Sequence, residues 1–442
     1  MLVRHGLSSF NTEHRVQGRD DASSLTPEGH QQARAVGQAL KELRFDHVYT
    51  SPLSRASATA DSLLADHGQG LTAEASDDLL EIDLEPWSGL LRPEIQERFP
   101  EQERQWRQAP EALVLEHADG RRYQPLVELR EQADRFKRHL LERHPAANDP
   151  SSQQTVLVVA HNAILRCLLL SLLELPTAGF RRLRLDNASI SVLNLSPSPR
   201  GGTAVQVESL NGVGHLGLPV PSKGRGARLL LVRHGETNWN REGRFQGQID
   251  IPLNANGRAQ AEAASTFLAP VQIQRAYTSA MARPRQTAEA ILAAHPGVPL
   301  TSTKGLVEIG HGLWEGRLEP EIAEGWPELL ADWKRAPETV QMPEGETIHD
   351  VWERSLATWN RIAASLDPQE TALVVAHDAV NKAILCALLG LTAADIWAIK
   401  QGNGGVTVID YPDGATGTPV VAAMNLTNHL GGVLDRTAAG AL

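Results

Sequence analysis

Short, unbroken runs of apolar residues recur along the chain and are separated by longer polar and amphipathic stretches. The clearest runs cover residues 155–160, 229–232 and 371–376, and valine, leucine and alanine dominate them. Runs of this length without polar alternation are typical of strands that are buried on both faces of a sheet. We therefore predict that these segments are central strands.

Amphipathic stretches follow the apolar runs. Residues 27–43 and 255–268 place apolar side chains at helical spacing, and Thr26 with Pro27 and Glu28 forms a typical helix start. Strands that alternate with helices indicate an α/β fold, in which a mostly parallel sheet is covered by helices on both faces. In such folds the chemistry lies beyond the carboxyl ends of the strands.

The same pattern occurs twice in the chain. Leu2-Val-Arg-His-Gly6 returns as Leu231-Val-Arg-His-Gly235, and Val158-Val-Ala-His161 returns as Val374-Val-Ala-His377. Further shared segments follow in an unchanged order. A repeat of more than two hundred residues indicates two complete domains in tandem rather than a solenoid.

The domain boundary is predicted from composition. A stretch rich in proline, glycine and lysine, residues 219–226, reads as a linker between a first domain over 1–218 and a second over 227–442. Only Met1, Leu2 and Val3 precede the first Arg-His-Gly, whereas the second copy has a longer strand there. We therefore expect the native start to lie a few codons upstream.

Composition narrows the classes of function. The chain has 442 residues, of which 41% are hydrophobic and 21% charged, as expected of a folded globular protein. Its formal net charge of −11 has the wrong sign for general binding to nucleic acid or to an anionic membrane. The two cysteines cannot build a disulfide framework or a multi-cysteine metal site. Neither a membrane helix nor a secretory leader is visible, so we expect a cytoplasmic protein with no nucleic-acid or membrane partner.

A small set of polar residues recurs in both copies. It comprises two arginines, two histidines, an asparagine and a glutamate in each half: Arg4, His5, Asn11, Arg55, Glu81 and His161, and then Arg233, His234, Asn240, Arg283, Glu308 and His377. Arginine forks match phosphate oxygens, and neutral imidazole is a competent nucleophile toward phosphorus. A carboxylic acid can protonate the leaving alkoxide and then activate water. The set predicts phosphoryl-transfer chemistry.

Metal binding is a rival explanation for paired histidines. No His-x-x-x-His or His-Glu-x-x-His spacing occurs in these segments, and only one carboxylate recurs with them. We therefore predict no metal site.

These motifs resemble those of the histidine phosphatase superfamily, also called phosphoglycerate-mutase-like, in both halves. The family pattern Arg-His-Gly followed by asparagine occurs twice. The pattern Ser-Pro-Leu-x-Arg occurs as Ser51 to Arg55 and in degraded form as Ser279 to Arg283. The pattern Glu-x-x-x-x-x-Trp-x-Gly begins at Glu81 and at Glu308. The resemblance implies two tandem phosphoglycerate-mutase-like domains.

The resemblance also implies a role for each residue. His5 and His234 would become phosphorylated, and Glu81 and Glu308 would donate protons. The residues that would hold the phosphoryl group are Arg4, Asn11, Arg55 and His161 in the first half and Arg233, Asn240, Arg283 and His377 in the second. Such enzymes need neither a metal nor another cofactor.

Family members divide mainly into mutases and phosphatases. The segments between Glu81 and His161 and between Glu308 and His377 are shorter than the cap of a mutase, which favours a phosphatase acting on a small phosphorylated sugar or sugar acid. The tandem form, with Glu81-Ile-Asp-Leu84 and Val159-Ala-His-Asn-Ala163, is similar to phosphatases of photosynthetic organisms that act on 2-carboxy-D-arabinitol 1-phosphate. There are two alternatives. One is a cofactor-dependent phosphoglycerate mutase, and the other is a regulatory protein that binds a phosphorylated ligand and has one inactive half.

The halves differ near these motifs. Leu7 stands where the family usually has Glu or Gln, a place that Glu236 fills in the second half, so the first half could be weaker. Asp378 follows the second histidine where the first half has Asn162; this extra carboxylate could repel phosphate or bind a sugar hydroxyl. Which half is active, and the oligomeric state, stay open at this level.

Overall fold

The computed structural model describes residues 1–437 and separates into two compact units. The first consists of Met1–Pro197 with His215–Leu218, and the second of Ser198–Gly214 with the chain from Pro219 onward. The predicted boundary at 219–226 differs from this division in Ser198–Gly214, which lies with the second unit because a strand in it pairs with the sheet of that unit.

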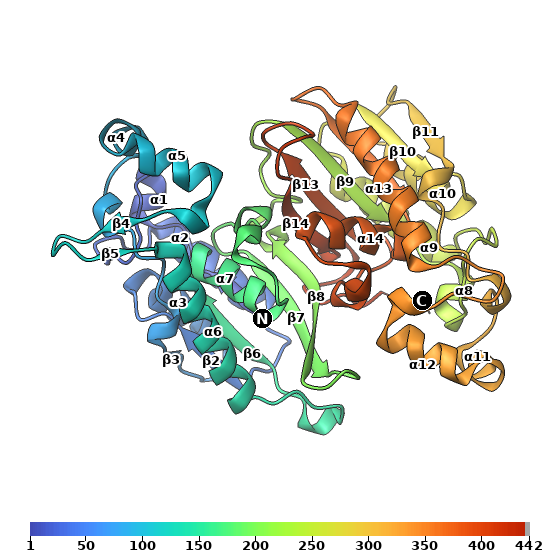
Figure 1. The fold of residues 1–442 in the computed structure, drawn as a ribbon, viewed down its shortest axis with the longest axis horizontal. Coiled ribbons are helices and arrows are strands. Elements are labelled where there is room, and N and C mark those ends of the chain that lie inside the picture. Colours follow the sequence, from blue (N-terminus) through green and yellow to red (C-terminus); the bar gives the residue numbers. More distant parts are fainter. Residues whose placement is uncertain (438–442) are drawn as a thin grey trace. The chain divides into compact units, whose positions relative to one another are not determined.

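The first unit alternates strands and helices as expected (Figure 1). Its elements are β1 (Leu2–Arg4), α1 (Ser9–Glu13), α2 (Pro27–Ala39), β2 (His47–Thr50), α3 (Ser54–His67), β3 (Glu74–Ala75), α4 (Arg92–Arg98), α5 (Pro100–Gln108), β4 (Leu115–Glu116), β5 (Arg122–Tyr123), α6 (Pro125–Arg143), β6 (Val156–Ala160), α7 (Asn162–Leu172) and β7 (Ile190–Pro197).

The second unit repeats most of this order. Its elements are β8 (Thr203–Gly212), β9 (Ala227–Arg233), α8 (Asn238–Glu242), α9 (Ala255–Leu268), β10 (Arg275–Ser279), α10 (Ala282–Leu292), β11 (Leu300–Thr303), α11 (Glu319–Gly325), α12 (Pro327–Arg335), α13 (Ile348–Ala364), β12 (Thr371–Ala376), α14 (Asp378–Leu389), β13 (Val406–Tyr411) and β14 (Val420–Leu426). The repeated order runs from β9 to β13; the described residues of this unit have no strands that match β4 and β5, and the unit also contains β8 and β14.

Each unit has a mostly parallel sheet, which confirms the predicted fold class. In the first unit β1, β6, β2 and β3 are parallel neighbours and β7 is antiparallel to β1. In the second, β9, β12, β10 and β11 are parallel, and β13, β14 and β8 continue the sheet in antiparallel fashion. Leu2 pairs with Val158 and Leu231 with Val374, so the two copies share one register.

The central strands are buried on both faces. Leu230 and Val232 of β9 belong to the core cluster that includes Ala264 of α9 and Ile291 of α10. Successive side chains of a strand point to opposite faces, and Leu231 is also completely buried, so the other face is covered too. Double coverage explains why these strands read as unbroken apolar runs.

The predicted element boundaries are close to the observed ones. The predicted helix at 27–43 ends at Ala39, and the Thr26 hydroxyl caps its start by accepting a hydrogen bond from the Gly29 amide. The predicted strand at 229–232 lies within the longer β9, which begins at Ala227 and ends at Arg233. Arg4 and Arg233 end their strands, and His161 and His377 directly follow theirs. The candidate residues thus meet at the carboxyl ends of parallel strands.

Candidate active site

His5 directly follows β1, and its backbone amide continues the strand by donating to the Ala160 carbonyl at 2.9 Å. Its Nδ1 lies 2.7 Å from the Gly6 carbonyl oxygen. A carbonyl only accepts, so Nδ1 carries the proton and Nε2 keeps its lone pair. His234 has the same arrangement with the Gly235 carbonyl at 2.7 Å. In both units, therefore, the backbone fixes the tautomer in which Nε2 keeps a free lone pair.

Both histidines are held in the neutral form. Burial, with the charges of Arg4 and Arg55, lowers the pKa of His5 well below its usual value. Burial and the charges of Arg283 and Arg233 do the same for the pKa of His234. A neutral imidazole with a free Nε2 is the form that attacks phosphorus.

In the first unit, arginine side chains beside His5 leave hydrogen-bond donors unused. Arg55, at the start of α3, is completely buried, and its two terminal nitrogens donate to the carbonyls of Asp20 and Gly18 at 2.8 Å each. Arg4 donates from Nη1 to the Leu185 carbonyl at 2.8 Å. The Nε–H groups of both arginines are buried without a partner among the described residues. Buried unpaired donors are rare, and here they are suited to an anion.

The second unit positions its arginines in a related way. Arg283 donates to the carbonyls of Gly247 and Ile249, and its Nε lies 3.3 Å from His234 Nε2. Burial lowers the pKa of Arg283 to about 10. Arg233 donates to the Gln401 carbonyl at 2.5 Å, and its Nε is buried without a partner in residues 1–437.

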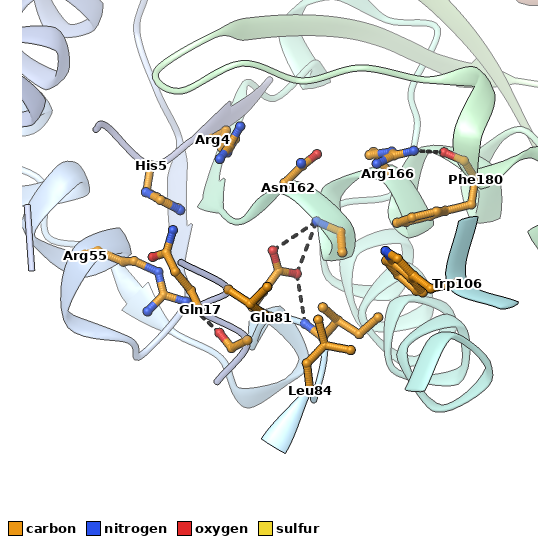
Figure 2. Close-up of a pocket in the computed structure, with 14 residues that line it drawn as sticks. Arg4, His5, Gln17, Arg55, Glu81, Leu84, Trp106, Asn162, Arg166 and Phe180 are labelled. Carbon is orange, nitrogen blue, oxygen red and sulfur yellow. Dashed lines mark hydrogen bonds between the residues drawn. The ribbon is translucent and has the colours of Figure 1, made fainter. Parts of the chain in front are cut away.

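Glu81 lies across the first cavity at the N-terminus of α7 (Figure 2). Its carboxylate accepts hydrogen bonds from the backbone amides of Ala163 and Ile164 at 3.1 Å and of Ile82 at 2.9 Å. Two of these amides belong to the start of α7, and the hydrogen bonds position the carboxylate toward the cavity.

Glu308 is held differently in the second unit. It accepts from the amides of Ile309 at 2.9 Å and of Asp378 at 3.0 Å. Burial and the adjacent Asp378 carboxylate raise the pKa of Glu308. A raised pKa keeps a carboxylic acid protonated at higher pH, which suits a proton donor.

The second histidine of each half lies behind the first. His161 and His377 are completely buried, and their Nε2 atoms lie 2.8 Å from the hydroxyls of Ser51 and Ser279. The ring of His161 is 5.1 Å from that of His5, but neither second histidine lines the cavity of its unit. The structure thus brings each beside the predicted nucleophile without exposing it to the cavity.

The predicted asparagines contribute mainly to local structure. The Asn11 side chain completes a capping box with Ser8 at the start of α1 and accepts a hydrogen bond from Asn187 at 3.0 Å. It does not line the first cavity. Asn240 makes the same capping box with Thr237 but does line the second cavity.

The two cavities differ in size. The space available to a water-sized molecule is about 180 Å³ in the first and about 10 Å³ in the second. His311, which is buried and lines the second cavity, occupies a place where the first has Leu84. The first site therefore has room beyond a phosphoryl group, whereas the second is nearly filled.

Several cavity residues escaped the sequence prediction. Gln17 and Gln246 line the two cavities and precede a glycine in both copies, so recurrence would have revealed them. Arg166 and Trp106 line only the first cavity. The second copy has Lys382 in the place of Arg166, so strict recurrence gave no signal.

The difference between Leu7 and Glu236 lies outside the cavities. The Glu236 carboxylate accepts from Asn254 at 2.7 Å and from Asn256 at 3.0 Å, and it pairs with Arg241 at 2.7 Å. It therefore ties the loop after β9 to the start of α9.

Membrane-spanning helices and clusters of metal-binding side chains are both absent from the part of the chain that the structure describes. Within residues 1–437, none of the helices combines the length and apolar character needed to cross a membrane. In the same range, no three His, Cys, Asp or Glu side chains gather in a way that could hold a metal ion.

The sequence matches the model of the histidine phosphatase superfamily (branch 1) over residues 1–206 and 229–426. A 2-carboxy-D-arabinitol-1-phosphatase of Triticum aestivum is 29% identical over 454 residues, which cover 98% of this chain and 86% of the wheat protein. A phosphoserine phosphatase 1 of Hydrogenobacter thermophilus is 31% identical and covers 46% of this chain and 94% of its own length.

Two further similarities each span about half of the chain. A probable phosphoglycerate mutase GpmB of Klebsiella pneumoniae is 36% identical over 220 residues, covering 49% of this chain and 94% of that protein. Among solved structures, YhfR of Bacillus stearothermophilus is 32% identical with a TM-score of 0.44, covering 46% of this chain and 99% of its own.

Proposed function

Since this chain belongs to the histidine phosphatase superfamily (branch 1), we propose that it is a metal-independent phosphomonoesterase that hydrolyses a small phosphorylated sugar or sugar acid through a phosphohistidine. The observation that carries the proposal is the setting of His5. A buried, neutral imidazole with Nε2 unprotonated lies beside two arginines whose buried Nε–H groups have no partner among the described residues. A phosphoryl group would satisfy these donors.

The reaction proceeds in two displacements. His5 Nε2 attacks phosphorus, the bond to the ester oxygen breaks, and Glu81 gives its proton to the departing alkoxide. Water then attacks the phosphohistidine while Glu81 takes a proton back, which releases inorganic phosphate and restores both groups. Arg4 and Arg55 stabilise the charge on the phosphoryl oxygens in both steps. In the second unit His234, Glu308, Arg233 and Arg283 take these parts.

The remaining predicted residues act from behind or beside the nucleophile. We infer that His161 and His377 hold the phosphoryl group or support the imidazole ring of His5 and His234, from which their own rings are 5.1 Å away. Asn11 and Asn240 fix the loop that follows the nucleophile through their capping boxes.

The leading substrate is 2-carboxy-D-arabinitol 1-phosphate. Support comes from the wheat protein, whose similarity extends over nearly the whole tandem chain rather than over one half. The larger first cavity also has space for a sugar acid attached to the phosphoryl group.

The test is phosphate release, in EDTA, from a panel of sugar, sugar-acid and glycolytic phosphates. Wild type is compared with His5→Ala, His234→Ala and the double variant, each checked by circular dichroism for folding. We expect release that survives EDTA, decreases in one or both single variants and disappears in the double variant.

Two results would contradict the proposal. Isomer exchange that requires 2,3-bisphosphoglycerate and releases no phosphate would identify a mutase. Tight binding of a phosphorylated compound without turnover would identify a regulatory protein.

A further inference from the structure

The two sites differ in charge at equivalent positions. Three guanidinium groups and one carboxylate line the first cavity: Arg4, Arg55 and Arg166 with Glu81. Two guanidinium groups and two carboxylates line the second: Arg233 and Arg283 with Glu308 and Asp378. In each site the two arginines beside the proposed nucleophilic histidine are needed for the phosphoryl group. The first site therefore has one more cation than a phosphoryl group requires.

The extra cation is Arg166 on α7. Figure 2 shows Arg166 on the side of the pocket opposite His5 and Arg55, with Asn162 and Glu81 between them. Its guanidinium carbon lies 3.8 Å from the centre of the Phe180 ring, and one terminal nitrogen donates to the Phe180 carbonyl. These contacts hold the planar fork in place.

Arg166 keeps one donor for a ligand. Its Nε–H is buried without a partner in the described part of the chain, and the nearest carboxylate on the cavity wall, Glu81, is already bound by backbone amides. Burial lowers the pKa of Arg166 to about 9, and the side chain remains cationic at neutral pH. A guanidinium that lines a cavity and has an Nε–H without a partner is suited to a carboxylate.

Among the described residues that line the second cavity, none corresponds to Arg166. Lys382 stands in the place of Arg166, and its ammonium is 3.0 Å from the Asp378 carboxylate and faces the Trp397 ring at 5.0 Å. Asp378 also lies 3.9 Å from Arg233. The position that Asn162 occupies in the first site thus carries a negative charge in the second.

We propose that Arg166, with Asn162 beside it, forms a second anion subsite that binds a carboxylate of the substrate in the first site, and that Asp378 excludes such a group from the second. This inference rests on the proposed phosphatase function. It divides the substrate classes between the halves: phosphorylated acids for the first site, and phosphate esters without a second anionic group for the second.

The test uses a matched pair of substrates in the full-length chain. 3-Phosphoglycerate carries a carboxylate where glycerol 3-phosphate carries a hydroxymethyl group. Phosphate release from each is measured in the His234→Ala background, which reports the first site, and in the His5→Ala background, which reports the second. The readout is the ratio of kcat/KM for the acid to that for the alcohol.

In the first site, Arg166→Gln is expected to lower this ratio about tenfold or more, chiefly through KM of the acid, because one charge-assisted contact is lost. Arg166→Lys keeps the charge without the fork and should give an intermediate ratio. The exposed Arg138 on α6 supplies the control, since Arg138→Gln removes an equal charge away from the cavity and should leave the ratio unchanged. In the second site, Asp378→Asn should raise the ratio.

The subsite proposal would be overturned if Arg166→Gln lowered kcat/KM equally for both substrates. It would also be overturned if neither Arg166→Gln nor Asp378→Asn changed the ratio. If no phosphate is released from any ester, the phosphatase proposal fails by itself. The subsite is then decided by calorimetry in the His5→Ala/His234→Ala chain, where Arg166→Gln must weaken binding of 3-phosphoglycerate more than that of glycerol 3-phosphate.

Discussion

At the scale of single residues, the proposed reaction depends on which polar atoms of the site are bound by the protein and which are left for a ligand. The predicted nucleophiles His5 and His234 have their Nδ1 atoms bound by a backbone carbonyl. Beside them Arg4, Arg55 and Arg233 leave Nε–H groups without a partner among the described residues. Arg4 and Arg233 keep one bond to the protein that orients them and one donor for the ligand. This division makes a site that is rigid before an anion binds.

The activity of the second site is predicted to depend on pH through the Asp378 charge beside Glu308. Asp378→Asn removes the charge that helps to raise the pKa of Glu308, so this pKa should fall. Because Glu308 must be protonated to act as an acid, the high-pH limb of second-site activity should move to lower pH. The measurement is a pH profile of kcat in the His5→Ala background. Asn162→Asp in the His234→Ala background is the reciprocal control, and an unchanged limb in Asp378→Asn would contradict the assignment.

At the scale of elements, the loop that carries each nucleophile is packed against the start of the next long helix. A Cβ on Gly257 of α9 would lie 2.0 Å from the Glu236 carbonyl oxygen, and one on Gly29 of α2 would lie 2.1 Å from the Leu7 carbonyl oxygen. The neighbour is backbone in both cases and cannot rotate away. Only glycine permits this approach, which fixes the loop between strand and helix.

Gly257→Ala is therefore expected to lower the free energy of unfolding by about 1–3 kcal/mol and to impair second-site turnover, because the helix must move away from the loop. Gly325→Ala is the matched control in the same unit, since its Cβ would meet nothing within 4 Å. The measurement is urea unfolding followed by circular dichroism. Equal stability of the two variants would show that the helix yields easily.

A buried ion pair joins two strands of the second sheet. Arg228 of β9 donates to the Asp410 carboxylate of β13 at 2.6 and 2.8 Å, and its side chain is almost completely buried. Asp410→Ala leaves this guanidinium without its counter-charge and is expected to cost about 3–5 kcal/mol of unfolding free energy. Arg225→Ala, which breaks the exposed pair with Asp413, should cost less than about 1 kcal/mol. Similar losses in urea titrations of the two would contradict this account.

At the scale of the whole molecule, the boundary between the units is offset from the repeat in the sequence. β8 derives from the first copy, yet it pairs with β14, and the Asn211 amide donates to the Ala422 carbonyl at 2.6 Å. The Asn425 amide donates in turn to the Glu208 carbonyl at 2.8 Å. The sheet of the second unit therefore includes β8, a strand from the first copy of the sequence repeat, which pairs with β14.

Truncation should reveal this dependence. A fragment that begins at Ser198 is expected to be more stable than one that begins at Pro219, by about 2 kcal/mol or more, because the shorter fragment loses β8 and leaves buried donors and acceptors of β14 unpaired. Urea unfolding of both fragments measures the difference. Equal midpoints would show that β8 adds nothing to the second unit.

The sequence by itself determined the fold class and most of the candidate residues. Buried parallel strands require unbroken apolar runs, and an ordered set of polar residues that recurs in two diverged copies stands out from its surroundings. These are local signals, so β12 and α9 were predicted with their observed bounds, and His5, Glu81 and Arg55 were predicted to share a strand-end site.

Only the tertiary structure decided what depends on contacts between distant segments. It placed His161 behind His5, gave Asn11 to a capping box and added β8 to the second unit. It also left the Arg166 Nε–H without a partner among the described residues, whereas Lys382 in the other copy pairs with Asp378. The physical reason is that burial, pairing and cavity volume arise from side chains far apart in sequence. No spacing along the chain encodes which donors remain free.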